Sequence, residues 1–257
     1  MHPFQPRGIR IDGEDAERFL QAQLTLDVRA LGAGVLQPAG WCDSHGRVIV
    51  TGLLARGEPG FLLVVPNALR DQTMARIDRY RIGWKIRHQP ADVQPAGTDD
   101  EDALSLSYAS ERAMKPATGE ITELDEATVT DLLAADAIAG MPWLAPETQG
   151  RFLPQMLGLE ALGALSYRKG CYPGQEVIAR VRYRGRITRK LQRYRSIGGP
   201  PLPPGHEARA GSTRFTVLYA APAEGGQVGL AVVRVEPSEA DEPGTADQSA
   251  ADRFEWF

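Results

Sequence analysis

Cysteine and histidine are scarce in this chain of 257 residues, which holds two cysteines and four histidines. Cys42 and Cys171 lie far apart, so they form neither a CxxC pair nor a disulfide framework. No histidine lies at the spacing of a local zinc motif, and an iron–sulfur cluster needs about four Cys or His ligands. We therefore expect no resident metal, and no cluster held by these cysteines alone.

Long apolar runs are also missing. No segment approaches the roughly 18–20 apolar residues of a membrane helix, and the opening segment, MHPFQPRGIR, lacks the apolar stretch of a secretory signal. Hydrophobic residues make up 42% of the chain, which suffices for a sizeable core. We expect a cytoplasmic protein without membrane contact, built as one large domain or two smaller ones.

Charge is unevenly distributed, although the net charge is only −4. Residues 168–195 hold ten basic side chains and one acid, Glu176, which gives +9 there and leaves −13 for the remainder. Such a segment can bind phosphates, a polyanionic small molecule or an acidic partner, or it can be a solvated face paired with the acidic remainder. Because no RNA-binding motif accompanies it, we do not expect direct nucleic-acid binding.

Residues 1–186 have the apolar pattern of an α+β region. Strands are expected at 8–11, 35–42, 47–54 and 61–65, and helices at 12–24, 67–80, 124–139 and 174–183. Asp12 is the expected N-cap of the first helix. Residues 90–125 are acidic and interrupted by Pro116 and Gly119, so we expect a loop region there with one strand at 103–108.

Residues 187–257 have a different pattern, with short strand-like runs separated by Gly and Pro turns. Strands are expected at 191–197, 214–220 and 227–235, which together predict a small antiparallel β-barrel domain. Residues 237–252 are polar and acidic, and we expect them to be mobile. The aromatic end, residues 254–257, is expected to dock back as a final strand.

The segment KGCYPGQE, residues 169–176, holds the best candidate for chemistry. Gly170 and Gly174 bracket Cys171, and the turn leads into the helix expected at 174–183. The positive end of that helix and the charge of Lys169 both favour a thiolate at Cys171, the form used for nucleophilic attack, metal ligation or redox exchange. The alternative is a small buried thiol, which is the interpretation we favour for Cys42.

These residues resemble those of the YgfZ-type folate-binding protein family, whose signature is a Lys-Gly-Cys-aromatic-x-Gly-Gln-Glu run. GEDAERFLQAQLTLDV also resembles the first helix of that family, and WCDSHGRV resembles its Tyr-Cys-Asp-x-x-Gly-Arg turn. Residues 151–191 resemble the family nearly throughout. The resemblance implies the fold of the glycine-cleavage T-protein, with α+β subdomains around a central hole and a C-terminal β-barrel; here residues 90–125 are a shortened middle subdomain.

The resemblance also implies a function. Family members bind tetrahydrofolate or a derivative in the hole and support iron–sulfur client enzymes, tRNA-modifying ones among them, without being shown to catalyse a reaction. The site residues that it implies are those of the signature (Cys171, Lys169, Gln175 and Glu176) and those that would contact the cofactor (Asp27, Asp43, Arg184 and Trp143). For Asp27 and Asp43 the alternative is a turn or capping role.

Several positions differ from the family pattern. Val50 and Thr51 stand where T-proteins have an Asp pair, so no general base is left there for aminomethyl transfer. Pro6 and Leu132 stand where relatives have tryptophans, and Ile138 stands where they often have Glu. We therefore expect simple folates to bind weakly.

Two alternative functions remain open. The chain could be a tetrahydrofolate-dependent one-carbon transferase with Cys171 as nucleophile or acceptor. It could instead be a tRNA-interacting module that uses the basic segment at 168–195. In each case we expect a monomer.

Overall fold

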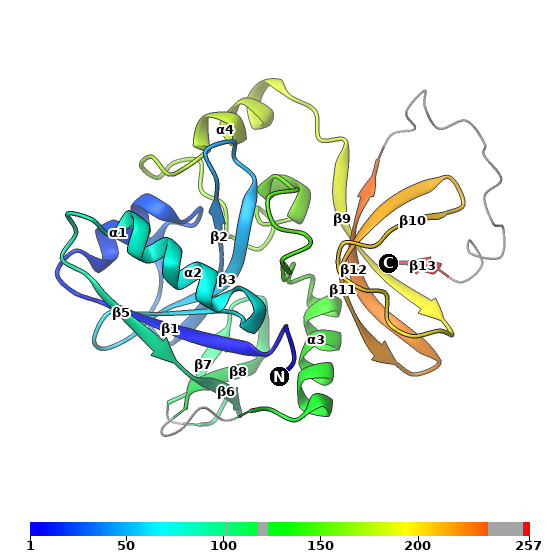
Figure 1. The fold of residues 1–257 in the computed structure, drawn as a ribbon, viewed down its shortest axis with the longest axis horizontal. Coiled ribbons are helices and arrows are strands. Elements are labelled where there is room, and N and C mark those ends of the chain that lie inside the picture. The colour runs from blue at the N-terminus through cyan, green and yellow to red at the C-terminus, as the bar shows by residue number, and fades with distance from the viewer. Residues whose placement is uncertain (101, 118–122, 236–253) are drawn as a thin grey trace.

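Two β-sheets organise the computed structural model, which describes residues 1–100, 102–117, 123–235 and 254–257 (Figure 1). Within these residues, the larger sheet has eight strands in the order β5-β1-β4-β3-β2-β7-β8-β6, and the smaller has five in the order β10-β11-β12-β9-β13. In the larger sheet β2 and β7 pair in parallel, whereas β1 to β4 pair antiparallel with one another. This is the mixed α+β class that the sequence predicts.

The larger sheet contains the four strands that were expected before residue 66. Its members are β1 (Pro6–Asp12), β2 (Val35–Cys42), β3 (Val48–Arg56), β4 (Phe61–Pro66), β5 (Arg87–Ala91), β6 (Val93–Ala96), β7 (Leu104–Leu106) and β8 (Ala109–Pro116). The strand predicted at 103–108 is confirmed by β7, but the expectation of a loop over the rest of 90–125 is wrong, because β6 and β8 also lie within it. Pro90 and Pro95 make the sequence of β5 and β6 favour strands weakly. β5 pairs with β1 and β7 with β2, whereas β8 pairs with both β7 and β6.

The helices are α1 (Ala16–Gln23), α2 (Asn67–Tyr80), α3 (Glu126–Ala139) and α4 (Gln175–Arg184), with the 3₁₀ turns η1 (Val28–Ala30) and η2 (Pro154–Leu157). The four predicted helices are confirmed. The predicted cap at Asp12 is wrong: Asp12 ends β1 and pairs with Arg87. Gly13, with φ of 123°, turns the chain before the helix, so that Asp15 occupies the cap position.

The smaller sheet is antiparallel throughout and barrel-like. It contains β9 (Arg189–Ile197), β10 (Glu207–Ala210), β11 (Thr213–Ala223), β12 (Gly226–Arg234) and β13 (Phe254–Trp256). The aromatic end of the chain does dock back, because β13 pairs with β9. The segment expected to be mobile, 237–252, lies outside the described residues. The domain boundary between residues 186 and 187 stays a prediction.

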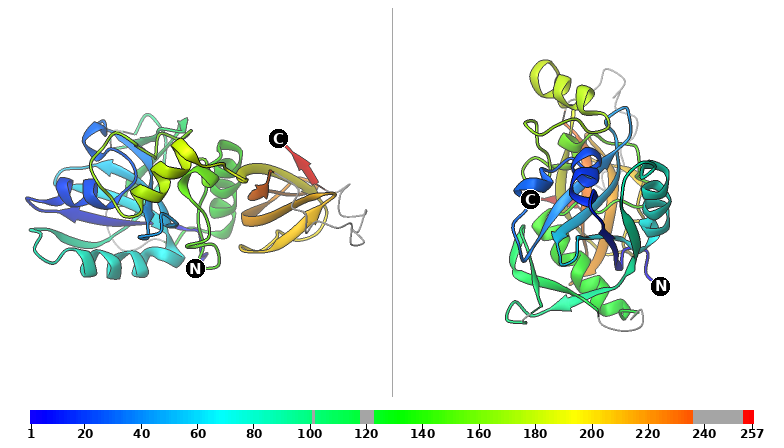
Figure 2. Two further views of the ribbon diagram at one scale, coloured as in Figure 1. Left: turned by 90° about the horizontal axis from the view of Figure 1, so that it is seen from above. Right: turned by 90° about the vertical axis from the view of Figure 1, so that its left-hand side faces the viewer.

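One apolar cluster runs through the centre of the molecule. α3 lies between the two sheets (Figure 2) and contributes Val129, Leu133 and Ala137 to it. The larger sheet adds residues such as Leu53, and the smaller sheet adds residues such as Leu230. The two sheets are therefore joined by a shared core rather than by a single linker.

A second apolar cluster covers the other face of the larger sheet, where Phe19 of α1 and Ile77 of α2 pack against Trp41 of β2. The longest helices, α2 and α3, have 14 residues each. Across the described part of the chain, no helix combines the length and the apolar character needed to span a membrane.

The start of α4 is packed tightly on the turn between β2 and β3. Gly174 caps the helix with φ of 77°, and a Cβ built on it would lie 2.3 Å from the Cα of Gly46. Gly46 also has a positive φ, of 76°. Two glycines therefore allow two backbones to touch, and this contact fixes the loop that carries Cys171.

We predict that Gly174→Ala lowers the free energy of unfolding by about 2–4 kcal/mol, because it adds both left-handed strain and a backbone clash. Gly170→Ala is the matched control, since Gly170 brackets Cys171 on the other side and a Cβ there meets nothing within 4 Å. It should change stability by no more than about 0.5 kcal/mol. Urea unfolding measures both variants, and equal effects would contradict the close packing.

Candidate functional site

Cys171 lies exposed on the loop before α4, whereas Cys42 at the end of β2 is buried. Burial raises the pKa of the Cys42 thiol well above its ordinary value. The loop itself is not loose, because Tyr172, next to Cys171, is only 6% exposed and its hydroxyl donates to the carbonyl of Ser166 over 3.4 Å. The chain therefore presents one thiol to the surroundings and keeps the other inside.

Lys169 links the Cys171 loop to the loop after α1 by two buried hydrogen bonds. Its side chain is 7% exposed, and Nζ donates to the backbone carbonyls of Leu24 and Leu26 over 2.6 and 2.9 Å. Burial lowers the pKa of Lys169 to about 8, and the nearby Asp27 partly opposes that shift. The ammonium group, which we expected beside the thiol of Cys171, is thus directed at the loop after α1.

Asp27 and Asp43 are both used by local backbone structure. Asp27 precedes η1, and its Oδ1 accepts from the side chain of Gln21 over 2.9 Å and from the backbone of Arg29. Oδ1 of Asp43 accepts from the backbone N–H groups of His45 and Arg47, each over 2.9 Å. The capping and turn roles are therefore present at both positions. The fold nevertheless brings them to the Cys171 loop, Asp27 through Lys169 and Asp43 through Gly174.

The remaining signature residues lie at the start of α4. Gln175 donates weakly, over 3.5 Å, to the carbonyl of Lys169, and Glu176 is exposed. Among the described residues, Arg182 of α4 forms an ion pair with Glu160. Glu176 and Arg180, which lie one helical turn apart, do not pair with each other there. Arg184 is exposed on the last turn of the helix.

Trp143 belongs to a second, buried centre at the middle of the molecule. Its Nε1 donates to Oδ2 of Asp136 over 2.7 Å, while Tyr108 and Arg112 donate to Oδ1 over 2.9 and 2.6 Å. Asp136 is 5% exposed on α3 and was missed in the sequence. The available signal was its spacing, since it lies three residues after Leu133, on the buried face of the helix.

A small cavity lies beside Asp136, and its volume decides whether a folate ring fits there. Pro6, Leu132 and Trp143 all line it, so the two positions that lack the family tryptophans do meet there. Its volume of about 20 Å³ is room for roughly one water molecule, so a bicyclic ring does not fit the arrangement present. Ile138 does not line it; that side chain is 49% exposed and faces the smaller sheet.

Val50 and Thr51 stand where T-proteins have an Asp pair, and here both side chains have structural roles. Val50 lies in the cluster beneath α1 and α2. Thr51 is buried, and its hydroxyl donates to the carbonyl of Pro142 over 2.8 Å and accepts from the N–H of Leu144 over 3.1 Å. Neither side chain can remove a proton from a substrate at neutral pH.

The buried ammonium group of Lys169 leads to a prediction about pH. Its pKa is about 8 in the folded protein against an ordinary value of 10.5, so between these values the unfolded chain binds more protons. Stability should therefore rise with pH across this window. Relative to Lys169→Met, the wild type should gain roughly 2–3 kcal/mol in free energy of unfolding between pH 7.5 and 10.

The matched control is Lys190→Met, because Lys190 is exposed on β9. Its difference from the wild type should stay constant over the same pH range. Urea unfolding at several pH values gives both curves. A flat difference for Lys169→Met would show that its charge is not buried in solution.

Sequence comparison with known proteins finds relatives, although no family model matches the chain. An uncharacterized protein of Haemophilus influenzae is 32% identical over 191 residues, which cover 71% of this chain and 68% of that protein. The tRNA-modifying protein YgfZ of Klebsiella pneumoniae is 30% identical over 70% of this chain and 66% of its own length. YgfZ of Escherichia coli O127:H6 is 29% identical over 90% of this chain and 83% of its own length.

Comparison with solved structures finds the glycine cleavage system aminomethyltransferase T of Bartonella henselae. The TM-score is 0.68 at 14% identity, over 91% of this chain and 77% of that one, which is a likeness of fold. The sequence relatives and this likeness agree with the resemblance of the KGCYPGQE segment. The chain belongs to the YgfZ family, and it has the α+β fold of the glycine cleavage aminomethyltransferase with a barrel-like sheet at its C-terminal end.

Proposed function

We propose that this protein maintains iron–sulfur enzymes, including tRNA-modifying ones, by presenting the thiol of Cys171 to them. The observation that carries the proposal is the contrast along one short loop. Lys169 and Tyr172 are buried and anchored, yet the thiol between them is exposed. Packing does not account for a cysteine in that position, since structural cysteines are usually buried.

An accessory role is supported better than catalysis. Val50 and Thr51 offer no general base, and their side chains are committed to packing and to backbone hydrogen bonds. In the described part of the chain, no three His, Cys, Asp or Glu side chains gather as a metal site would require. A cluster handled by this protein would therefore come from the client enzyme. We propose that the protein meets its clients as a monomer.

The names of the relatives support the choice of client. YgfZ of Klebsiella pneumoniae and of Escherichia coli are both described as tRNA-modifying proteins. The Cys171 loop could serve such a role through an enzyme that modifies tRNA, because a thiol on a fixed surface loop can reach a partner's thiol or cluster. We propose that this protein supports tRNA modification indirectly, through such an enzyme.

We predict that Cys171→Ala keeps the stability of the wild type but fails to restore iron–sulfur enzyme activity and tRNA methylthiolation in a strain that lacks the protein. The exposed side chain makes few contacts to lose, so the loss should be functional. Cys42→Ala, with its urea unfolding measured in parallel, is the control for removing a thiol. Restoration by Cys171→Ala equal to that of the wild type would make the thiol dispensable.

Tetrahydrofolate is proposed to bind only weakly, with a dissociation constant above about 100 μM. The cavity beside Asp136 holds roughly one water molecule, and Trp143 already uses its N–H on Asp136. Without an aromatic surface at Pro6 or Leu132, about 0.5–1.5 kcal/mol of stacking is lost for each position. Calorimetric titration with tetrahydrofolate measures this, and binding in the low micromolar range would contradict it.

A further inference from the structure

Helix α4 is held to the rest of the molecule by few side chains. Figure 1 shows it at the outer edge, next to the turn between β2 and β3. All ten of its residues are described, and Ile178 is the one that is buried. Its cap, Gly174, adds the close backbone contact with Gly46. The core therefore uses little of this helix, and most of its surface is directed outward.

The outward side of α4 carries Arg180, Tyr183 and Arg184, which we call the α4 face. Because these residues are spaced i, i+3 and i+4, they lie together on the helix surface. Arg180 and Arg184 are both exposed, and no ion pair of the described residues includes either one. The α4 face thus presents two positive charges to its surroundings, with an aromatic ring between them.

Tyr183 is strongly exposed for an aromatic residue, with 73% of its surface open. Its ring stands edge-on to the ring of Tyr167, with 6.5 Å between the two centroids. Tyr167 is in turn covered by the guanidinium group of Arg182, 5.0 Å from its ring. The ring of Tyr183 is therefore supported on one side and open on the other. Tyrosine and arginine are the residue types that most often dominate the energy of a protein interface.

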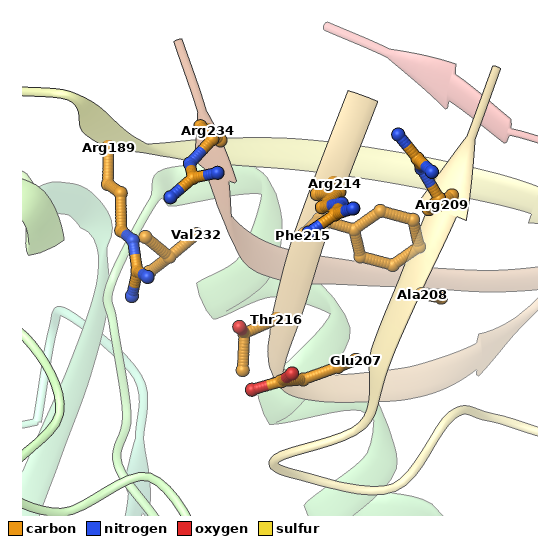
Figure 3. Close-up of a pocket in the computed structure, with 9 residues that line it drawn as sticks. All are labelled: Arg189, Glu207, Ala208, Arg209, Arg214, Phe215, Thr216, Val232 and Arg234. Atoms are coloured by element: carbon orange, nitrogen blue, oxygen red, sulfur yellow. The ribbon is translucent and has the colours of Figure 1, made fainter. Parts of the chain in front are cut away.

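The position of the α4 face distinguishes it from the other group of arginines. That group lines a pocket of about 340 Å³ on the smaller sheet (Figure 3), where Glu207 lies among them and pairs with Arg151. The α4 face instead adjoins the candidate site, because Cys171 lies four residues before Gln175, the first residue of α4. A helix of ten residues is only about 15 Å long. A protein that meets the thiol therefore also meets α4.

A protein suits this surface better than a nucleic-acid strand does. Glu176 is exposed one turn before Arg180, and Glu160 is exposed beside Arg182. These carboxylates repel a strand of phosphates, whereas a protein can offer charges of both signs. The neighbouring thiol of Cys171 has no part in binding a phosphate backbone, but it can react with the thiols and clusters of a protein. The positive charge of the α4 face then calls for an acidic surface on that protein.

We propose that the α4 face is the docking surface for the iron–sulfur client enzyme, and that it binds an acidic surface next to the client's cluster. The proposal rests on the accessory function proposed for Cys171. The two arginines steer the approach of the acidic partner, and Tyr183 supplies the apolar contact that holds it. Docking on α4 thus determines where the client's cluster lies relative to the thiol.

The test is biolayer interferometry between the full chain and a purified iron–sulfur enzyme that methylthiolates tRNA, with its cluster present. Arg180→Gln combined with Arg184→Gln should lower the association rate about three- to tenfold at low salt and flatten its dependence on salt. Tyr183→Ala should instead raise the dissociation rate about tenfold, because lost packing at the centre of an interface appears there. Undetectable binding of the wild type would overturn the proposal.

Arg79→Gln combined with Arg87→Gln is the matched control. It removes the same charge from exposed positions on α2 and β5, which lie apart from α4 in Figure 1. It should leave both rates unchanged, and urea unfolding should show every variant folded. An equal loss with this control would reduce the effect to net charge and overturn the proposal. So would a loss of RNA binding by the α4 variants with unchanged binding of the client, since that would identify a nucleic acid as the partner.

Cys171→Ala separates the docking surface from the function on which it rests. It leaves the α4 face intact, so it should bind the client within about twofold of the wild type while it fails to restore activity in the strain that lacks the protein. If it binds and also restores activity, the role of the thiol is wrong and the docking surface stands. If the α4 variants bind as the wild type does while Cys171→Ala fails to restore activity, the docking surface is wrong and the role of the thiol stands.

Discussion

The contact between the ammonium group of Lys169 and the carbonyls of Leu24 and Leu26 is the link on which the candidate site depends. It joins positions 145 and 143 residues apart in the chain. One side of the link is the loop after α1, with Asp27, and the other is the loop that carries Cys171. Placing a charge inside the protein is costly, and the lowered pKa of Lys169 reflects that cost. The two hydrogen bonds to these carbonyls offset it.

Asp136, another buried charge, is stabilised in the same way with the signs reversed. Three donors, from Tyr108, Arg112 and Trp143, share its two oxygens. They come from separate parts of the chain, so the carboxylate ties the β7–β8 region to α3. This network fills the place where the family resemblance suggests a ligand. Trp143, which the resemblance places at the cofactor, donates its indole N–H to this carboxylate, and such charge-assisted hydrogen bonds are strong.

Sequence patterns predicted those parts of the fold whose information is local. The alternating and apolar runs of β1 to β4, and the apolar spacing of α3, needed no tertiary knowledge. β5 could not be predicted in this way, because its partner is the distant β1, and β6 and β8 were missed because their short segments, interrupted by Pro95 and Pro116, favour strands only weakly. The direction of the long Lys169 side chain was also beyond reach, since adjacency to Cys171 in sequence does not fix where Nζ points.

α3 lies between the two sheets and shares one apolar cluster with both. A hinge at this place would have to separate Leu133 from residues such as Leu230 and expose them to water, which a flexible joint between independent domains avoids. The shared core therefore favours a fixed arrangement of the two sheets over a hinge motion that opens and closes them. The larger sheet and the barrel-like sheet are kept at a constant separation, set by the thickness of one helix and the side chains around it.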